Sequence, residues 1–293
     1  MQQSTPQFAN YCACFIDLLG QKELLKGQSI LPNKSHIEEY EAFVLSASKS
    51  IGAIEKLQQH SAFFMEDADK SVSMRDQIPR EELTAYDEMK AAKPKQQRWS
   101  DGLVLYHSLA TDKLKCPMNA VVQIFMMSGM LCLLGLVQKT PVRGAIEISW
   151  GVELHNNELY GAVVANSYTL ESEVAQYPRI IVGKYTIEYL NAHIQQALNP
   201  NDKIAIYNKS LAILCLGMTA VDKDGYHILD YLGSSFKKSV LTNDADDRPS
   251  FYEQANQFVC SQYEYFTQNE NIKLSERYAL LKSYFERNKN LHV

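Results

Sequence analysis

Two segments indicate how the chain folds: FIDLLG at residues 15–20 and RWSDGLVLY at residues 98–106. The first stretch ends an alternating run of small and apolar residues, which predicts a central strand that closes in a turn. The second places Ser100-Asp101-Gly102 between two β-rich segments, a combination typical of a hairpin with Asp101 at its tip. These strands therefore belong to a sheet that is at least partly antiparallel.

Around these stretches, strands and helices alternate without a strict βα rhythm. A capping box that begins at Ser35 opens a long helix with a 3.6-residue apolar period. Further strands are expected at 142–154, at 179–182 and on both sides of the turn at 222–225, and further helices at 120–137, 161–176, 184–198 and 250–291. The pattern predicts a mixed α+β fold in which helices cover one face of a largely antiparallel sheet.

We assign residues 1–249 to one domain. One segment is inserted into this domain and a second segment follows it. Residues 65–95 are charged and interrupted by prolines, so we expect an exposed insertion with a short helix over 80–92. This insertion is open to interpretation as a solvated loop, a lid or a dimer contact. Residues 250–293 form a C-terminal helical extension, either an appendage or a dimerisation element.

The composition limits the classes of function. With 46% hydrophobic and 22% charged residues, the chain can bury a sizeable core as ordinary globular proteins do. A formal net charge of −5 argues against a general nucleic-acid binder, which needs an excess of Lys and Arg to neutralise phosphates. The six cysteines show no CxxC pair and no zinc-ligand spacing, so we interpret them as reduced core residues.

One segment, residues 120–137, carries no charge and approaches the ~20 residues that a membrane-spanning helix needs. Polar residues and glycines interrupt it and Pro141 follows, so we favour a helix buried in the core or in a subunit interface over a membrane span. The N-terminal residues lack the basic and apolar regions of a signal peptide. We therefore expect a soluble, cytoplasmic protein.

Asp17 and Asp101 carry the functional prediction. Asp17 lies within an apolar strand, where an unpaired charge is costly, and Asp101 lies at the expected hairpin tip. If the two strands are neighbours, both carboxylates converge on one edge of the sheet, which suits hard cations such as Mg²⁺ or Mn²⁺. Taken alone, Asp17 is also open to a structural role as a buried hydrogen-bond acceptor.

Five motifs occur in the same order as in class III adenylate and guanylate cyclases. FIDLLGQKELL resembles their opening metal-binding motif, and RWSDGLVLY resembles their second metal-binding turn. The other three similar motifs are RGAIEISWG at 143–151, YGAVVANSYTLESEVA at 160–175 and YPRIIVGKYTIEYL at 177–190. With the late DKDGYHILDYL at 222–232, the set looks most like the pyrimidine cyclases of bacterial Pycsar anti-phage systems.

The resemblance implies a ferredoxin-like catalytic core that acts as a homodimer with sites at the interface. It implies a substrate, CTP or UTP, that is converted to the 3′,5′-cyclic monophosphate and pyrophosphate as a signal in anti-phage defence. It also implies two Mg²⁺ or Mn²⁺ ions per site, held by Asp17, Asp101 and a main-chain carbonyl near Leu18. One ion would activate the ribose 3′-hydroxyl, and the other would bind the triphosphate.

The positions that hold a transition-state Asn and Arg in purine cyclases depart from that pattern. They fall on Ala165 and Thr169, and Asn166 and Tyr168 are close but displaced. Another cation should then meet the developing charge, and the candidates are Arg143 of RGAI and Arg179 of YPRI. A strand-end salt bridge is the alternative role for Arg143.

The positions that read the base differ as well. The first falls on Gln97 and the second near Glu158. The Gln97 amide can donate and accept, which selects no single base, whereas the bulky neighbour Trp99 could narrow the pocket toward a pyrimidine. Trp99 is also open to interpretation as an ordinary core residue.

Three functions remain open from the sequence. The first is a cytidylate or uridylate cyclase, favoured by the retained Asp17 and Asp101. The second is an adenylate or guanylate cyclase with unusual base-reading residues. The third is a catalytically silent, cyclase-like domain that binds nucleotides or a partner, and the loss of the usual Asn and Arg is its best support.

Overall fold

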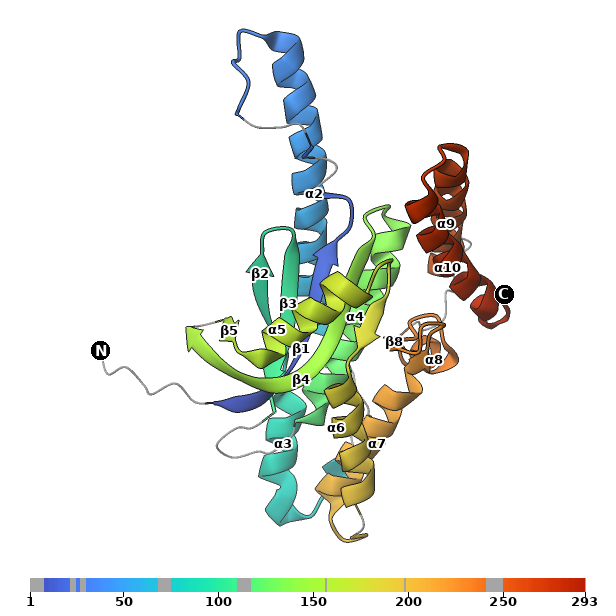
Figure 1. Ribbon diagram of the computed structural model, residues 1–293. Coiled ribbons are helices and arrows are strands. Elements are labelled where there is room, and N and C mark those ends of the chain that lie inside the picture. Colours follow the sequence, from blue (N-terminus) through green and yellow to red (C-terminus); the bar gives the residue numbers. More distant parts are fainter. Residues whose placement is uncertain are drawn as a thin grey trace, which may run out of the picture.

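The strand that contains Asp17 lies near the centre of a mixed β-sheet in the computed structural model, which describes residues 8–21, 25–26, 30–67, 75–109, 117–155, 157–197, 199–240 and 250–292 (Figure 1). The described residues form an eight-stranded sheet with the strand order β2-β3-β1-β4-β6-β8-β7, and β5 pairs with β4. The strands are β1 Ala9–Leu18, β2 Lys95–Trp99, β3 Gly102–Ser108, β4 Val142–His155, β5 Glu158–Tyr160, β6 Ile180–Val182, β7 Thr219–Val221 and β8 His227–Leu229. The β4–β6 pair is parallel and the other pairs are antiparallel.

Two glycines allow β1 to be flanked closely on both sides near Asp17. A Cβ atom on Gly102 of β3 would lie 2.5 Å from the main-chain oxygen of Ile16, and one on Gly144 of β4 would lie 2.5 Å from that of Phe15. Both distances are shorter than any real Cβ contact. Glycine at these two positions is therefore what lets three strands meet beside the two aspartates.

Most helices cover one face of the sheet. They are α2 Ile37–Asp67, α3 Leu83–Ala91, α4 Met118–Val137, α6 Lys184–Gln196, α7 Lys203–Gly217, α8 Ser234–Val240, α9 Phe251–Gln268 and α10 Ile272–Asn288. Short 3₁₀ turns lie at Arg75–Gln77, Arg80–Glu82 and Lys289–Leu291. The long helix α2 extends well beyond the sheet, next to the β2–β3 hairpin (Figure 1).

The central helix of this layer is α4, the apolar segment of the sequence. It is long and apolar enough to cross a membrane by length and composition, but most of it is buried within the protein. Its side chains join those of β1, β3 and β4 in the main hydrophobic core, with Phe125, Cys132 and Leu136 fully buried. The expectation of a core helix is therefore supported, since the sheet and the other helices occupy the surface that lipid would need.

The opposite face of the sheet carries a smaller core under α5 Ala162–Thr169. Val163 and Val164 of α5 pack there on Tyr11, Ala13 and Phe15 of β1. A π-helix, Leu170–Val174, continues from α5. The expected helix over 161–176 thus consists of two turns of α-helix followed by a wider π segment.

The C-terminal helices α9 and α10 form an antiparallel pair at the edge of the molecule (Figure 1). They are not peripheral to the core, because Tyr252, Val259, Leu281 and Phe285 belong to the same buried cluster as the sheet residues. The chain turns between the two helices at Glu270, whose φ is 54°.

The mixed, largely antiparallel α+β fold with C-terminal helices is confirmed. Within the expected insertion at 65–95, the short helix is present as α3, whereas 68–74 lie outside the described residues. The domain limits at 249 and 250 stay a prediction.

Candidate active site

The two aspartates come together at one end of the sheet. In the strand register, Asp17 of β1 lies opposite Gly102 of β3 on one side and opposite Arg143 of β4 on the other. The Leu18 main-chain N–H donates to the main-chain oxygen of Asp101 at 3.3 Å, which ties the hairpin tip to the end of β1. The hairpin and β1 thus bring together two acids that are far apart in the sequence.

The electrostatics of Asp17 reflect this proximity. Burial and, second to it, the negative charge of Asp101 raise the pKa of Asp17 to about 6, against the opposing effects of Arg143 and the Leu18 backbone. Arg143 Nη2 lies 3.7 Å from Asp17 Oδ2. Two carboxylates therefore share a partly buried site with one nearby cation.

A third acid, Glu171, completes this group and was not singled out from the sequence. It lies in the π-helix, is 1% exposed, and its Oε1 lies 2.5 Å from Arg143 Nε. Burial raises the pKa of Glu171 to about 7, against the effect of Arg143 and with smaller contributions from Asp17 and Asp101. Helical periodicity does not reveal a π segment, although π-helices occur often at functional sites. We call Asp17, Asp101, Arg143 and Glu171 the carboxylate–arginine cluster.

The cluster offers hard oxygen donors but no closed metal cage. Across the described residues, no group of three or more His, Cys, Asp and Glu side chains has a metal-binding arrangement. The two strand-end carboxylates nevertheless face mutual repulsion and partial desolvation, a condition that a divalent cation relieves. The residues present are thus compatible with Mg²⁺ or Mn²⁺ held by Asp17 and Asp101, with further ligands from water or substrate.

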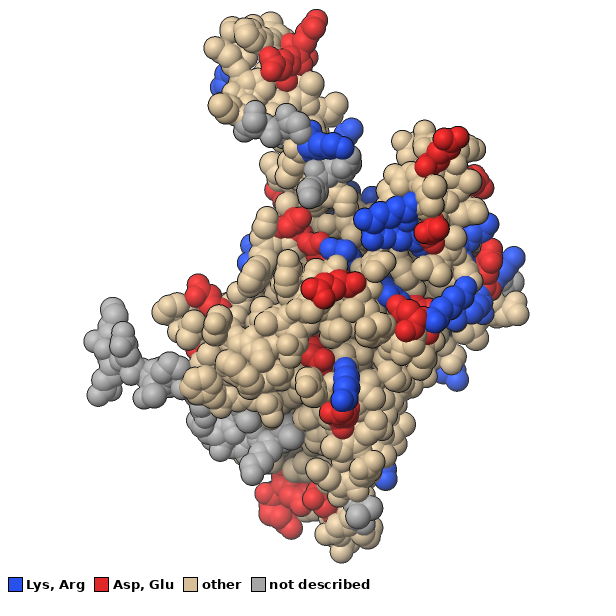
Figure 2. Space-filling view, viewed as in Figure 1, with Lys and Arg blue, Asp and Glu red and all other residues tan. Residues whose placement is uncertain are grey.

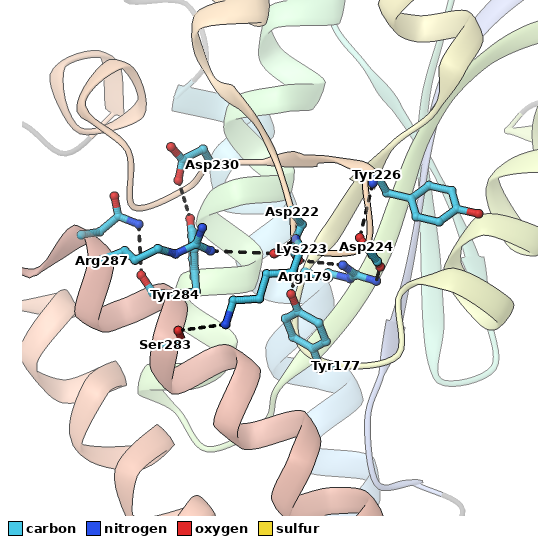
Figure 3. Close-up of polar contacts among 11 residues, drawn as sticks. Tyr177, Arg179, Asp222, Lys223, Asp224, Tyr226, Asp230, Ser283, Tyr284 and Arg287 are labelled. Carbon is cyan, nitrogen blue, oxygen red and sulfur yellow. Dashed lines mark hydrogen bonds and ion pairs between the residues drawn. The ribbon is translucent and has the colours of Figure 1, made fainter.

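Arg179, the second predicted cation, lies in a different group of residues (Figure 3). Its Nη1 atom lies 2.7 Å from Asp222 Oδ2, and its Nη2 atom lies 2.6 Å from Asp224 Oδ2. The side chain is 4% exposed, and its guanidinium stacks on the Tyr177 ring at 4.5 Å. Of the two arginines, Arg143 contacts the Asp17 side chain directly, whereas Arg179 contacts Asp222 and Asp224.

The predicted base-reading residues line one cavity of about 810 Å³. Gln97 and Trp99 of β2 form one wall, and Glu158 of β5 lies on the other. The Gln97 carbonyl oxygen accepts a hydrogen bond from the Leu159 N–H at 2.9 Å, so its NH₂ group is the part left to donate to a ligand.

Aromatic rings connect this cavity to β1, the strand that carries Asp17. Trp99 contacts Phe15 edge-on with ring centroids 5.7 Å apart, and Tyr168 does the same at 5.4 Å. Phe15 lies two residues before Asp17, on the same face of β1. Trp99 is 43% exposed and Tyr168 is 52% exposed, so both rings are accessible to a ligand.

Asn166, the remaining predicted substrate-binding residue, lies elsewhere. It lines a second cavity of about 650 Å³ together with Glu147, Lys184 and Tyr226. The structure therefore joins Trp99 and Tyr168 through Phe15 of β1 and places Gln97 in the cavity with Trp99, but it places Asn166 beside another hollow.

Comparisons with known proteins give little guidance. No family model and no curated protein matches the sequence. Among solved structures, the chain is similar to the crystal structure of the adenylyl cyclase CyaB from P. aeruginosa. The TM-score is 0.41 and the sequence identity 11%, over 64% of this chain and 84% of that one. Any functional conclusion must therefore come from the residues of the site.

Proposed function

We propose that this protein is a nucleotide cyclase that converts a nucleoside triphosphate into its 3′,5′-cyclic monophosphate and pyrophosphate. The observation that carries the proposal is the convergence of Asp17 and Asp101, from separate segments, beside Arg143 at the end of three paired strands. The order of the sequence motifs supports the same conclusion.

In this proposal, two Mg²⁺ or Mn²⁺ ions are held by the carboxylates of Asp17 and Asp101 and by the main-chain carbonyl of Leu18. Bound there, the ions would lower the pKa of the ribose 3′-hydroxyl and offset the charge of the departing pyrophosphate. The reaction is intramolecular: the 3′-oxygen attacks the α-phosphorus, the bond to the pyrophosphate oxygen breaks, and the hydroxyl proton leaves to solvent.

The contribution of the protein is positioning and charge stabilisation, because no covalent enzyme intermediate is required. The rings of Trp99 and Tyr168 beside Phe15 would hold the nucleoside and exclude water near the reacting atoms. Arg143 contacts Asp17 and Glu171. It would stabilise the negative charge that develops at the α-phosphate.

We assign Arg179 a positioning role instead. Its partners Asp222 and Asp224 already neutralise it, and its contacts hold the start of β6 against the 222–225 turn. Because the main-chain N–H of Gly144 donates to the Arg179 carbonyl at 3.0 Å, this arrangement also fixes the strand position next to Arg143.

For the base, we propose a pyrimidine, CTP or UTP, bound in the cavity between Gln97 and Glu158. The Gln97 NH₂ group would donate to a base carbonyl, and Trp99 would limit the space available to the ring. We propose that Asn166 contacts the substrate either after it moves or from a second protomer. The product would serve as a signal in anti-phage defence.

We further propose that the protein is cytoplasmic and works as a homodimer, with residues 1–249 as the catalytic domain and 250–293 as a helical extension. The expectation of interfacial sites comes from the resemblance to class III cyclases, and the base cavity lined by β2 and β5 is where a second protomer would complete a site.

The test is incubation of the purified protein with each of ATP, GTP, CTP and UTP and Mn²⁺ or Mg²⁺, followed by product identification by mass spectrometry. Cyclic CMP or cyclic UMP is expected. Asp17→Asn and Asp101→Asn should each lower kcat/KM by roughly 1000-fold, because the loss of a carboxylate that binds the ions removes several kcal/mol of charge stabilisation. Asp76→Asn, which removes an exposed carboxylate, is the matched control.

The other outcomes separate the alternatives. Cyclic AMP or cyclic GMP would retain the cyclase and reject the pyrimidine preference. No product from any triphosphate, with nucleotide binding that Asp17→Asn does not affect, would favour a catalytically silent nucleotide-binding domain. That second function is favoured by one observation, the apolar and hydroxyl residues Ala165 and Thr169 where purine cyclases hold Asn and Arg.

A further inference from the structure

The second cavity of the molecule has a buried carboxylate in its lining. The cavity lies between β4, the π-helix, the start of α6 and residues 225–227, and its volume of about 650 Å³ falls within the roughly 300–1,000 Å³ that small-molecule sites occupy. Glu147 of β4 lines this cavity, although the residue is only 3% exposed. Leu170, Val182 and Ile187 add apolar surface. The cavity thus combines apolar walls with one buried acid.

The two carboxylate oxygens of Glu147 differ in their partners. Oε1 accepts hydrogen bonds from the Ile148 N–H at 2.8 Å, the Thr186 N–H at 3.0 Å and the Thr186 hydroxyl at 3.1 Å. Oε2 has no hydrogen-bond partner within the described parts of the chain. It lies against Gly183, where a Cβ atom would overlap it, and Gly183 also lines the cavity. One oxygen therefore holds the start of α6, and the other is left for a ligand.

The charge of Glu147 also lacks a partner. No Lys, Arg or His among the described residues forms an ion pair with it. Lys184, the one basic Lys or Arg side chain that lines the cavity, is paired with Glu188, whose Oε1 lies 3.5 Å from Lys184 Nζ. Figure 2 likewise shows basic and acidic side chains side by side over α6. A buried carboxylate without a cation is costly, and burial raises the pKa of Glu147 against the effect of its three hydrogen bonds.

This arrangement selects one kind of ligand. A single free carboxylate oxygen accepts one N–H of an ammonium group, whereas a guanidinium pairs with both oxygens of a carboxylate. Tyr185 and Tyr226 also line the cavity and are 52% and 45% exposed, and aromatic rings of this kind attract a cation. We infer that this cavity is a second ligand site, in which Glu147 Oε2 binds the ammonium group of a small primary amine with an apolar or aromatic body.

The direct test measures by calorimetry how the full chain binds benzylamine, which is protonated at neutral pH, and its neutral and anionic analogues benzyl alcohol and benzoate. Benzylamine should bind about 10- to 100-fold more tightly than either analogue, as expected for a hydrogen bond between charged groups. Glu147→Gln should remove this preference, because the amide keeps an oxygen for the donors of Oε1 but places an NH₂ group where Oε2 lies. Glu188→Gln is the control, since it makes the same change at an exposed acid that lines the same cavity, and it should alter the constant less than about threefold.

Thermal melting verifies that each variant is folded. Equal affinity for benzylamine and benzyl alcohol, or unchanged benzylamine binding by a folded Glu147→Gln variant, overturns the inference. If Glu147→Gln does not fold, Tyr226→Leu decides at an exposed ring: benzylamine affinity should fall about 2- to 5-fold, and an unchanged affinity overturns the inference. Neither Asp17 nor Asp101 lines this cavity, and the binding is measured without turnover. Failure to cyclise any nucleotide would therefore reject the proposed function and leave this inference standing.

Discussion

Arg143 is shared unequally between two carboxylates. Glu171 lies 2.5 Å from its Nε atom, and Asp17 lies 3.7 Å from its Nη2 atom. Glu171 is almost fully buried, so it cannot exchange this partner for water. The closer carboxylate therefore fixes the arginine, while the weaker contact with Asp17 leaves its outer nitrogens available for a substrate oxygen.

This arrangement gives a prediction for both stability and binding. Glu171→Gln keeps the shape of the side chain but removes its charge from the pair with Arg143. The free energy of unfolding should rise by about 1–3 kcal/mol near neutral pH, because a pKa raised to about 7 means that the folded protein disfavours the ionised Glu171 carboxylate. Affinity for triphosphate should rise about 3- to 10-fold, because less negative charge opposes the ligand. Urea unfolding and calorimetry measure the two effects.

Glu173→Gln is the matched control in the same π-helix, since that side chain is exposed. It should leave both quantities within experimental error. Weaker triphosphate binding by Glu171→Gln would contradict a phosphate-binding role for Arg143, and an unchanged or lower unfolding free energy would contradict the unfavourable burial of the Glu171 charge.

At the level of the elements, the strands around the site could be predicted because each has a simple local signal. Residues 15–20 and 98–106 carry alternating apolar residues and the Ser100-Asp101-Gly102 turn, and the structure pairs them as neighbours. The register that places Asp17 opposite Gly102 has no such local signal, because both faces of β1 are buried, one in the main core and the other under α5.

Other features could not be predicted from a single sequence. The π-helix has the same apolar spacing as an α-helix over a few residues, so Glu171 gave no signal beyond its place in the Tyr-x-Leu-Glu motif. The partners of Arg179 depend on a contact between residues 179 and 222–224, which no local pattern encodes.

The contact between β6 and the 222–225 turn gives a pH-dependent prediction. Burial alone would raise the pKa of Asp222, but hydrogen bonds from Tyr177, the Lys223 N–H and Arg179 outweigh it and lower this pKa. The ionised carboxylate therefore stabilises the folded protein fully above its unfolded pKa of about 3.9, and this contribution is lost as the pH falls through the lower folded-state pKa.

Asp222→Asn should thus lower the free energy of unfolding by about 1–3 kcal/mol near neutral pH. The difference from the wild type should shrink as the pH falls below about 4, which urea unfolding at several pH values can measure. Asp224→Asn is the comparison, because this partner of Arg179 is 42% exposed and should matter less. A difference that grows toward acidic pH would refute the assignment.

At the scale of the whole molecule, the sheet and the C-terminal helices share one core. Residues of α4 and α9 contact one another, and α10 adds polar contacts to the 222–232 segment. We therefore expect the described parts of the chain to unfold together.

A second feature of the whole molecule is the group of exposed apolar and aromatic side chains on the β4–β5 arm. Trp150 is 46% exposed, Leu154 is 50% exposed and Tyr160 is 64% exposed. Large rings in such positions are typical of the centres of protein interfaces rather than of solvated surfaces. Since Leu154 and Tyr160 also line the cavity of Gln97, a second copy bound to this arm would close the base cavity.

If the two protomers share each site, the aspartates of one should work with the base cavity of the other. Asp17→Asn and Gln97→Ala should then each be inactive as pure dimers, yet their equimolar mixture should recover about a quarter of the wild-type activity. Half of the dimers would be mixed, and one of their two sites would be intact. Product formation after the two variants are unfolded and refolded together measures this recovery.

A mixture of Asp17→Asn with Asp101→Asn is the control and should stay inactive, because both substitutions affect the same half of the site. If neither mixture recovers activity although light scattering shows that dimers are present, the aspartates and the base cavity of one site lie in the same chain.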